Sequence, residues 1–255
     1  MNISVVIPVL NEMACLPATI ASVRTAIKDA EIIAVDGGSN DGSREWLLEQ
    51  HDIQTITESK GKGLQQNAGG FAARGDLLLF LHADCQLPEN AEQELYQVMS
   101  DGRIAGGCFY VRFNETRPLT LRMVSFGINI RTRLFCMAYG DQALFIRKEI
   151  FHQIGGFPEW PLFEDSELVR RFRRRGAFAC IASPVTISAR RYLALGVCRT
   201  AFLVHLLKLA FRLGVSPARL KTWFADIRIT AEPTSSSASS MKVKLTALGR
   251  RMTWR

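Results

Sequence analysis

One stretch decides the fold: Leu77-Leu78-Leu79-Phe80-Leu81-His82-Ala83-Asp84, an unbroken apolar run that ends in a carboxylate. A short run of this kind is typical of a strand that is buried on both faces, as in parallel sheets covered by helices. Gly75 and Asp76 precede the run and Pro88 follows it, which leaves too little length for a helix. We therefore expect Asp84 where a buried strand leaves the core, the place at which open α/β sheets bind ligands. The alternative is that Asp84 only caps the next helix.

The composition indicates a globular protein with one large domain, or one domain with an appendage. Of the 255 residues, 47% are hydrophobic, and the net charge is +8. A basic surface suits anionic partners, but no dense Lys/Arg block with interleaved aromatic residues marks a nucleic-acid face, so nucleic acid is not expected as a partner. The six cysteines are scattered without metal-type spacing, which favours free thiols in a reducing cytosol.

The sequence predicts no membrane-spanning segment. The chain opens on the strand pattern of residues 3–8, without a basic region or a cleavage site, which argues against a signal peptide. No clean apolar stretch reaches ~20 residues, so a spanning helix is not predicted. Residues 193–215 are largely apolar but interrupted by cationic residues, which predicts either a helix on an anionic bilayer surface or a core or dimer helix. The expected location is cytoplasmic, with the inner face of the cell membrane as the site of any peripheral contact.

Strand and helix patterns alternate along the first third of the chain. Apolar or β-branched runs occupy residues 3–7, 32–35, 53–57 and 77–81, and segments with helical spacing separate them. This alternation predicts a doubly wound parallel sheet. Pro8 is expected to end the first strand.

Polar residues follow all four of these strands. They are Asn11 and Glu12, then Asp36 with Gly37 and Gly38, then Lys60 and Lys62, and finally Asp84. Because parallel strands deliver their carboxyl ends to one edge, we expect these residues to converge. Glycines allow close backbone approach, lysines neutralise phosphate, and a terminal Asp can hold a divalent cation, so the edge is typical of a nucleotide site. The alternatives are a simple turn at residues 36–43 and a solvated loop around Lys60 and Lys62.

A second carboxylate cluster occurs at Glu164, Asp165 and Glu167, where a helix is expected to begin. Acidic residues there suit the helix dipole without any catalytic role. The functional interpretation is that one of them faces the cleft as a general base. Neither a Gly-x-Gly-x-x-Gly motif after the first strand nor a P-loop is present, which disfavours nicotinamide dehydrogenases and P-loop nucleotidases.

Four segments, in this order and spacing, resemble family 2 glycosyltransferases over roughly residues 3 to 180: Ser4 to Glu12, Asp36 to Ser43, His82 to Asp84, and Glu164-Asp165. Further segments resemble a bacterial branch known as arsenosugar-biosynthesis-type glycosyltransferases: Gly61 to Asn67, Leu79 to Asp84, Tyr139 to Gln142, and Gly155 to Pro158. The branch name by itself establishes no substrate.

The resemblance implies an α/β nucleotide-diphosphosugar transferase fold (GT-A, Rossmann-like) with a mostly parallel central sheet and a C-terminal helical extension. We expect a catalytic domain over residues 1–190, an amphipathic helical extension over 191–232, and a flexible Ser-rich linker and basic tail over 233–255. The implied reaction is a metal-dependent, inverting transfer of a sugar to an acceptor hydroxyl. The donor is a nucleotide-diphosphosugar, a UDP-sugar by default, and the acceptor is a small molecule or lipid-linked.

The resemblance also assigns roles to residues. On the nucleotide-sugar side it implies Pro8, Asn11, Glu12, Asp36, Gly37, Gly38, Lys62, Gln66, His82, Ala83 and Asp84. On the acceptor or donor-sugar side it implies Gly107, Asp141 and Gln142. Asp84 is expected to bind Mg²⁺ or Mn²⁺, and Asp165, beside Glu164, to deprotonate the acceptor.

Two departures from the family pattern qualify this prediction. His82 stands where the metal motif usually has its first Asp, so Asp84 is expected to carry the protein's metal contact nearly alone. The Gln-x-x-Arg-Trp motif of processive synthases is absent after Asp165, which favours transfer of a single sugar. A nucleotidyltransferase is the first alternative, but Asn11-Glu12 replaces the Gly-rich basic loop that it needs. A non-catalytic, membrane-associated nucleotide-sugar-binding subunit is the second, and the presence of both Asp84 and Asp165 argues against it.

Overall fold

Four parallel strands form one half of the central sheet, as the alternating patterns predict. The computed structural model describes residues 1–115, 117–223, 226–229 and 243–246. The elements in chain order are β1 (Ile3–Val9), α1 (Leu16–Ala26), β2 (Glu31–Asp36), α2 (Ser43–Leu48), β3 (Ile53–Thr57), α3 (Lys62–Ala72), β4 (Leu77–Phe80), β5 (Cys85–Gln86), α4 (Ala91–Met99), β6 (Ile104–Phe113), α5 (Leu119–Phe135), the 3-10 helix η1 (Gly140–Gln142), β7 (Leu144–Arg147), α6 (Lys148–Gln153), α7 (Glu164–Phe172), β8 (Ala177–Ile187), α8 (Arg190–Leu195), α9 (Val197–Arg212), α10 (Pro217–Trp223), β9 (Asp226–Ile229) and β10 (Val243–Thr246).

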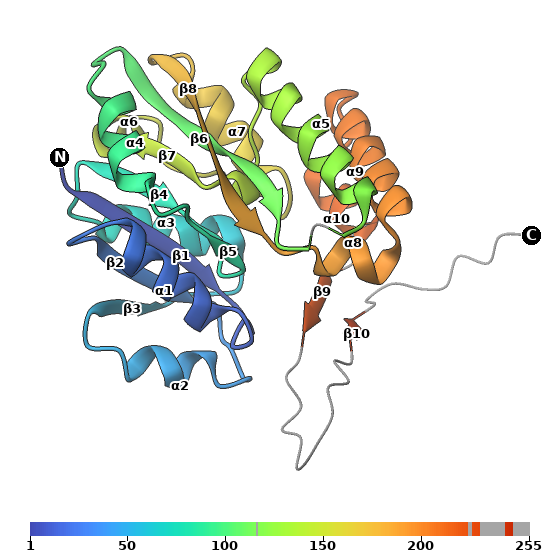
Figure 1. The fold of residues 1–255 in the computed structure, drawn as a ribbon, viewed down its shortest axis with the longest axis horizontal. Coiled ribbons are helices and arrows are strands. Elements are labelled where there is room, and N and C mark those ends of the chain that lie inside the picture. Colours follow the sequence, from blue (N-terminus) through green and yellow to red (C-terminus); the bar gives the residue numbers. More distant parts are fainter. Residues whose placement is uncertain (116, 224–225, 230–242, 247–255) are drawn as a thin grey trace, which may run out of the picture.

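The main sheet has eight strands in the order β3-β2-β1-β4-β7-β6-β8-β5. Strands β3, β2, β1 and β4 are mutually parallel, β7 is antiparallel to both of its neighbours, and β6 and β8 are parallel to each other. The mostly parallel α/β architecture that the sequence predicts is therefore confirmed, with β7 reversed near the centre and the short β5 reversed at the edge (Figure 1).

Helices cover both faces of this sheet. Residues of α1, α2, α4 and α5 form one core cluster with alternate residues of β1 and β4 such as Val5 and Leu79, and α4 and α5 lie against β6. Residues of α3, α6 and α7 form the cluster on the other face with Val6 and Phe80, and α7 lies against β6. Every residue of β4 is fully buried, which explains why its sequence is an unbroken apolar run and does not alternate.

The prediction that Pro8 ends the first strand is wrong. Strand β1 continues to Val9, and Pro8 lies opposite Val35 of β2. The reason is that β4 pairs with β1 only as far as Val6, opposite Phe80. Beyond that point β1 has a strand partner on one side only, so a residue without an N–H group is tolerated.

The C-terminal region forms short helices and not one continuous helix. The apolar stretch 193–215 divides at Gly196, whose φ of +86° ends α8 before α9 begins. The described part of the expected extension 191–232 also includes strand β9, which pairs with β10. Most of the expected linker and tail, residues 233–242 and 247–255, lies outside the described residues. The domain division remains a prediction.

Gly107 offers a test of how tightly the sheet is packed. A Cβ atom there would overlap the carbonyl oxygen of Ala179 and lie 2.7 Å from the ring of Phe145. We expect Gly107→Ala to lower the free energy of unfolding by about 3 kcal/mol, because the sheet cannot relax around the methyl group. At Gly102 a Cβ would meet nothing within 4 Å, so Gly102→Ala is the matched control and should stay within about 1 kcal/mol of wild type. Urea unfolding measures both, and equal stabilities would contradict the packing argument.

Candidate active site

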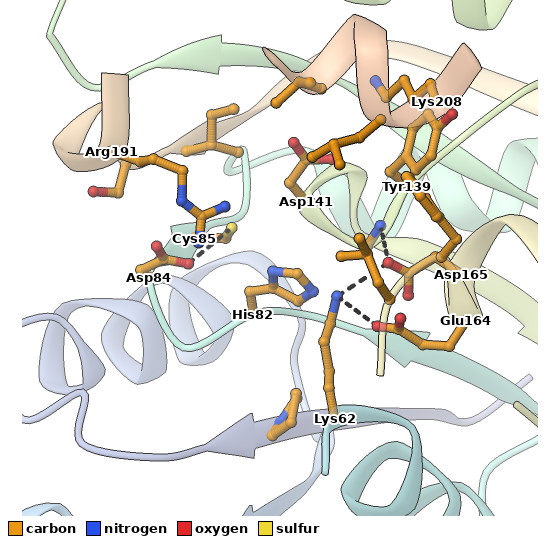
Figure 2. Close-up of a pocket in the computed structure, with 18 of the residues that line it drawn as sticks. Lys62, His82, Asp84, Cys85, Tyr139, Asp141, Glu164, Asp165, Arg191 and Lys208 are labelled. Atoms are coloured by element: carbon orange, nitrogen blue, oxygen red, sulfur yellow. Dashed lines mark hydrogen bonds and ion pairs between the residues drawn. The ribbon is translucent and has the colours of Figure 1, made fainter. Parts of the chain in front are cut away.

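A cavity of about 1210 Å³ lies at the carboxyl ends of β1 and β4, where the strand pattern predicts a ligand site. It is lined by the segments after β1 and β4, the first turns of α3, α7 and α8, and residues of α5 and α9. Segments that are far apart in the sequence therefore meet in one space (Figure 2). Because α8 and α9 line it, the cavity extends beyond the predicted domain boundary at residue 190.

Lys62 links two buried carboxylates across this cavity. Its Nζ lies 3.1 Å from Glu164 Oε1 and 3.0 Å from Asp165 Oδ2. Burial raises the pKa of Glu164, and the adjacent charge of Asp165 adds to the effect. Burial alone would lower the pKa of Lys62, but the two carboxylates outweigh it and raise that pKa. The three charges therefore depend on one another.

Gly140 completes this cluster through its backbone. Its N–H donates to Asp165 Oδ2 at 2.8 Å. A Cβ atom at residue 140 would lie 2.5 Å from His82 Nε2 and 2.7 Å from both Lys62 Nζ and Asp165 Oδ2. Any side chain at residue 140 would displace these three groups, so the glycine of the Tyr139-Gly140-Asp141-Gln142 segment allows them to lie together.

The two oxygens of Asp165 have different surroundings. Oδ2 accepts hydrogen bonds from Lys62 and Gly140, whereas Oδ1 is buried and has no hydrogen-bond partner among the described residues. A buried acceptor without a partner is costly unless a ligand supplies one. Oδ1 is thus the oxygen of this carboxylate that remains available to accept a hydrogen bond from a bound group.

His82, Asp84 and Cys85 place potential metal-ligand atoms within 4.8 Å of one another. His82 Nε2 is buried without a hydrogen-bond partner in the described structure. Burial, followed by the charge of Lys62, lowers the pKa of His82 well below its usual range, so the imidazole is neutral and able to bind a metal. Burial keeps Cys85 protonated by raising its pKa. An imidazole and a carboxylate fit Mn²⁺ better than Mg²⁺, which prefers oxygen ligands throughout.

Arg190, at the start of α8, contacts the acidic residues that follow two different strands. Its guanidinium makes two hydrogen bonds of 2.6 Å to the carboxylate of Glu12 and lies 3.0 Å from Asp84 Oδ2. The two-residue strand β5 brings Arg190 there by pairing Cys85 with Ile187, shortly before Arg190 in the chain. Sequence reasoning missed Arg190, although an arginine pair directly after a strand is a signal that was present.

The loops after β1 and β2 are held together by polar side chains. The buried carboxylate of Asp36 accepts hydrogen bonds from the N–H groups of Gly38 and Ser39. Asn11 Oδ1 accepts from the N–H of Asn40.

The side-chain amide of Gln65 connects the ends of β1 and β2. It donates to the carbonyl oxygens of Val9 and Val35, at 2.8 and 2.7 Å. Sequence reasoning selected Gln66, but its neighbour Gln65 is the glutamine that lines the cavity.

The structure brings nine of the predicted site residues to the cavity lining: Pro8, Glu12, Lys62, His82, Ala83, Asp84, Asp141, Glu164 and Asp165. The others are not among its lining residues: Asn11, Asp36, Gly37, Gly38, Gln66, Gly107 and Gln142. Gln66 is fully buried on α3, and Gly107 lies within the sheet between β7 and β8. Gln142 is also buried and bonds to Thr132, so it supports the wall of the cavity from behind.

Ser43, another residue of the Asp36 to Ser43 segment, is not a helix cap. Gly42 precedes α2, and no side chain caps that helix. The Ser43 hydroxyl instead accepts the N–H of Glu12 and donates to Asp41. It therefore contributes to the same loop network.

Comparison with known sequences yields a family and partial relatives. Residues 4–156 match the family described as "Glycosyl transferase family 2". An undecaprenyl-phosphate 4-deoxy-4-formamido-L-arabinose transferase of Pectobacterium atrosepticum is 37% identical over 143 residues, covering 52% of this chain and 43% of the relative. The Yersinia pestis protein of the same name is 32% identical over 158 residues, covering 57% of this chain and 48% of that one. The chain thus spans about half the length of these curated relatives.

Comparison with solved structures shows the fold. Staphylococcus aureus TarS 1–349 in complex with UDP-GlcNAc aligns with a TM-score of 0.59 at 14% identity, over 74% of this chain and 58% of that one. The mannosyltransferase PcManGT of Pyrobaculum calidifontis, in complex with GDP-Man and Mn²⁺, aligns with a TM-score of 0.59 at 21% identity, over 86% and 67%. These likenesses confirm the predicted GT-A fold.

Proposed function

The chain belongs to glycosyl transferase family 2, and we propose that it transfers a single sugar from a nucleotide-diphosphosugar to an acceptor oxygen, with inversion at the anomeric carbon. The observation that carries this proposal is the arrangement of the cavity. A carboxylate oxygen without a partner, Asp165 Oδ1, shares the space with the His82–Asp84 group and with Lys62. A base and a cationic diphosphate site in one cavity suit a direct displacement.

On the donor side, the loops after β1 and β2 would hold the base and ribose, and Lys62 and Arg190 would face the diphosphate. Pro8 and Glu12 line this part of the cavity, while Asn11, Asp36, Gly37 and Gly38 shape the loops. UDP is the default nucleotide of this proposal because many family 2 glycosyltransferases use it.

We propose that Asp84 and His82 hold Mg²⁺ or Mn²⁺. Arg190 pairs with Asp84 Oδ2, and Oδ1 accepts only a 3.7 Å hydrogen bond from the Cys85 thiol, so Oδ1 is the oxygen that would bind the metal. When bound, the ion neutralises charge on the leaving diphosphate. The neutral imidazole of His82 thus takes the position of the Asp that the family motif usually has there, and it shifts the preference towards Mn²⁺.

On the acceptor side, Asp165 would act as the general base through Oδ1. Lys62 and the Gly140 N–H fix Oδ2 and so orient the carboxylate. Glu164 would keep Lys62 in place from the other side.

The curated relatives are named as transferases that act with undecaprenyl phosphate, which supports a lipid-linked acceptor here. They are not named for arsenosugars, so that narrower branch rests on the motifs alone.

A lipid-linked acceptor would be reached at the membrane, and one face of the protein suits such contact. The α5–α9 face is a pair of apolar stripes at helical spacing, 41 to 77% exposed: Leu119, Met123, Phe126, Ile130, Leu134, Phe202, Leu206, Leu209 and Leu213. Residues 119–135 and 190–223 contain ten Arg or Lys residues and no Asp or Glu. Within the described residues, no helix has the length and hydropathy needed to span a bilayer. We propose peripheral contact between this face and an anionic bilayer.

Asp165→Asn tests the base. We expect the transfer rate to fall by about 10²- to 10⁴-fold, because the amide cannot accept the proton, while nucleotide binding survives. Turnover of UDP-, GDP- and dTDP-sugars with Mn²⁺ gives the rate, and calorimetry with the matching nucleoside diphosphate gives the binding.

Glu167→Gln is the matched control, since Glu167 lies on the same helix but pairs with Arg170 and Arg171 and does not line the cavity. Undiminished turnover in Asp165→Asn would remove Asp165 as the base. Absence of turnover with every donor in wild type would favour a binding subunit. Release of pyrophosphate from a nucleoside triphosphate and a sugar 1-phosphate, assayed separately, would indicate a nucleotidyltransferase.

Asp84→Ala tests the metal site. We expect the affinity for Mn²⁺ in the presence of nucleoside diphosphate to fall about ten-fold or more, because the carboxylate that binds the ion is lost. Electron paramagnetic resonance of free Mn²⁺ measures it. Asp52→Ala is the control, because it removes an exposed carboxylate that pairs with Arg24 outside the cavity lining. A titration of Asp84→Ala that matches wild type would exclude Asp84 as a ligand.

Vesicle co-sedimentation tests the α5–α9 face. We expect binding to phosphatidylglycerol vesicles, weaker binding to phosphatidylcholine vesicles, and loss of binding in the double variant Met123→Glu, Phe126→Glu. Leu48→Glu changes an equally exposed apolar residue on α2 and should bind as wild type does. A dimer that the double variant abolishes, with no vesicle binding in wild type, would assign the face to a second copy of the chain.

A further inference from the structure

A cluster of positive charge lies on the side of the cavity formed by α5 and α9, apart from the residues used above. Lys208 of α9 and Arg131 of α5 both lie over the ring of Tyr139, with Lys208 Nζ at 4.0 Å and the Arg131 guanidinium carbon at 4.7 Å from its centroid. Figure 2 shows Lys208 beside Tyr139, across the cavity from Asp84. Both cations line the cavity, together with Arg212.

These cations face the carboxylate of Asp141 but form no ion pair with it. Among the described residues, no ion pair joins Lys208 or Arg131 to a carboxylate. Arg131 donates through its terminal nitrogen to Gln142 Oε1 at 3.2 Å, but its buried Nε has no hydrogen-bond partner. A buried guanidinium N–H without an acceptor is costly, and it indicates a place that an external acceptor fills.

The charges that face Lys208 explain its state. They are Arg131 from α5, Arg212 from its own helix, and Asp141 from η1. Burial first, and then the charge of Arg131, lowers the pKa of Lys208 to about 7, and Asp141 offsets this only in part. The cluster thus carries more positive than negative charge in a partly buried space, which favours an anion.

The walls around the cluster are apolar. Val124 and Ile128 of α5 and Val204 and Leu207 of α9 line the same cavity. The outer sides of both helices carry the exposed α5–α9 face. A ligand for this position therefore combines an anionic group with an apolar part.

We propose that Arg131 and Lys208 form a second anion site, which binds the phosphate group of an amphiphilic phosphate ester whose apolar part lies between α5 and α9. The ligand is either a membrane lipid phosphate or a free phosphate ester with an apolar substituent. That this ligand is the acceptor rests on the proposed function, but the binding site itself does not.

Calorimetry with farnesyl phosphate, without any nucleotide-sugar, tests the site. We expect wild type to bind it, and Lys208→Gln to bind about ten-fold more weakly or less, because a charge-assisted hydrogen bond is lost. Lys208→Arg keeps the charge and should bind within about three-fold of wild type, which excludes misfolding as the cause. Lys148→Gln removes the same charge on α6, outside the cavity lining, and should bind as wild type does. Equal affinities of wild type and Lys208→Gln would overturn the proposal.

Proton uptake gives a readout that a purely structural role would not produce. Lys208 is mostly neutral at pH 8 without ligand, and a bound phosphate favours its charged form, so binding should take up protons there. Titrations in two buffers of different ionisation enthalpy measure this uptake, which should vanish in Lys208→Gln. Equal uptake in both proteins would contradict the role of Lys208.

The probes separate the possible sources of the phosphate. Farnesyl phosphate binding much more tightly than both inorganic phosphate and farnesol supports an amphiphilic ester, and equal affinity for inorganic phosphate overturns it. Co-sedimentation with vesicles containing phosphatidic acid, lost in Lys208→Gln, would identify a lipid source. Farnesyl phosphate binding without turnover of any donor would leave the site in place and remove the transferase. Donor turnover without farnesyl phosphate binding would support the transferase and remove the second anion site.

Discussion

The site depends on the ion pairs of Lys62 with Glu164 and Asp165. Two adjacent carboxylates are almost fully buried at the start of α7, and such charges are tolerated only where a cation and hydrogen bonds compensate them. Lys62 supplies the cation from the first turn of α3, and Gly140 supplies an N–H. Removing Lys62 would leave an uncompensated pair, at a cost of about 3–5 kcal/mol. One charge cluster therefore fixes the relative position of α3, α7 and η1.

Arg190 performs a similar task on the other side of the cavity. It joins Glu12, after β1, to Asp84, after β4, and it is itself held by the short pairing of β5 with β8. The parallel half of the sheet supplies acidic strand ends, and the C-terminal half supplies the arginine. A divalent cation bound at Asp84 and a guanidinium at its second oxygen would together face the charge of a diphosphate.

Charge is distributed unevenly between the two walls of the cavity. Carboxylates gather on the side of the strand ends, whereas α5 and the helices after residue 190 carry basic residues and no acidic ones. The same helices are apolar outside and cationic inside, at Arg131 and Lys208. This arrangement suits a donor that enters beside the sheet and an amphiphilic phosphate that enters between the helices.

The sequence by itself determined the layered fold and the location of the site. Apolar runs that end in Asp36 or Asp84 identify buried parallel strands, because a strand covered on both faces must be apolar and its carboxyl end must leave the core. Local patterns could not identify Gln65 or Lys208 as residues of the cavity, because each acts through partners far away in the chain. Only the tertiary structure decided that Pro8 stays within β1 and that Gln65, not Gln66, faces the cavity. It also decided that Arg131 and Lys208 both lie over the ring of Tyr139. The physical reason is that charge compensation and burial depend on distances in space, which spacing along the chain does not specify.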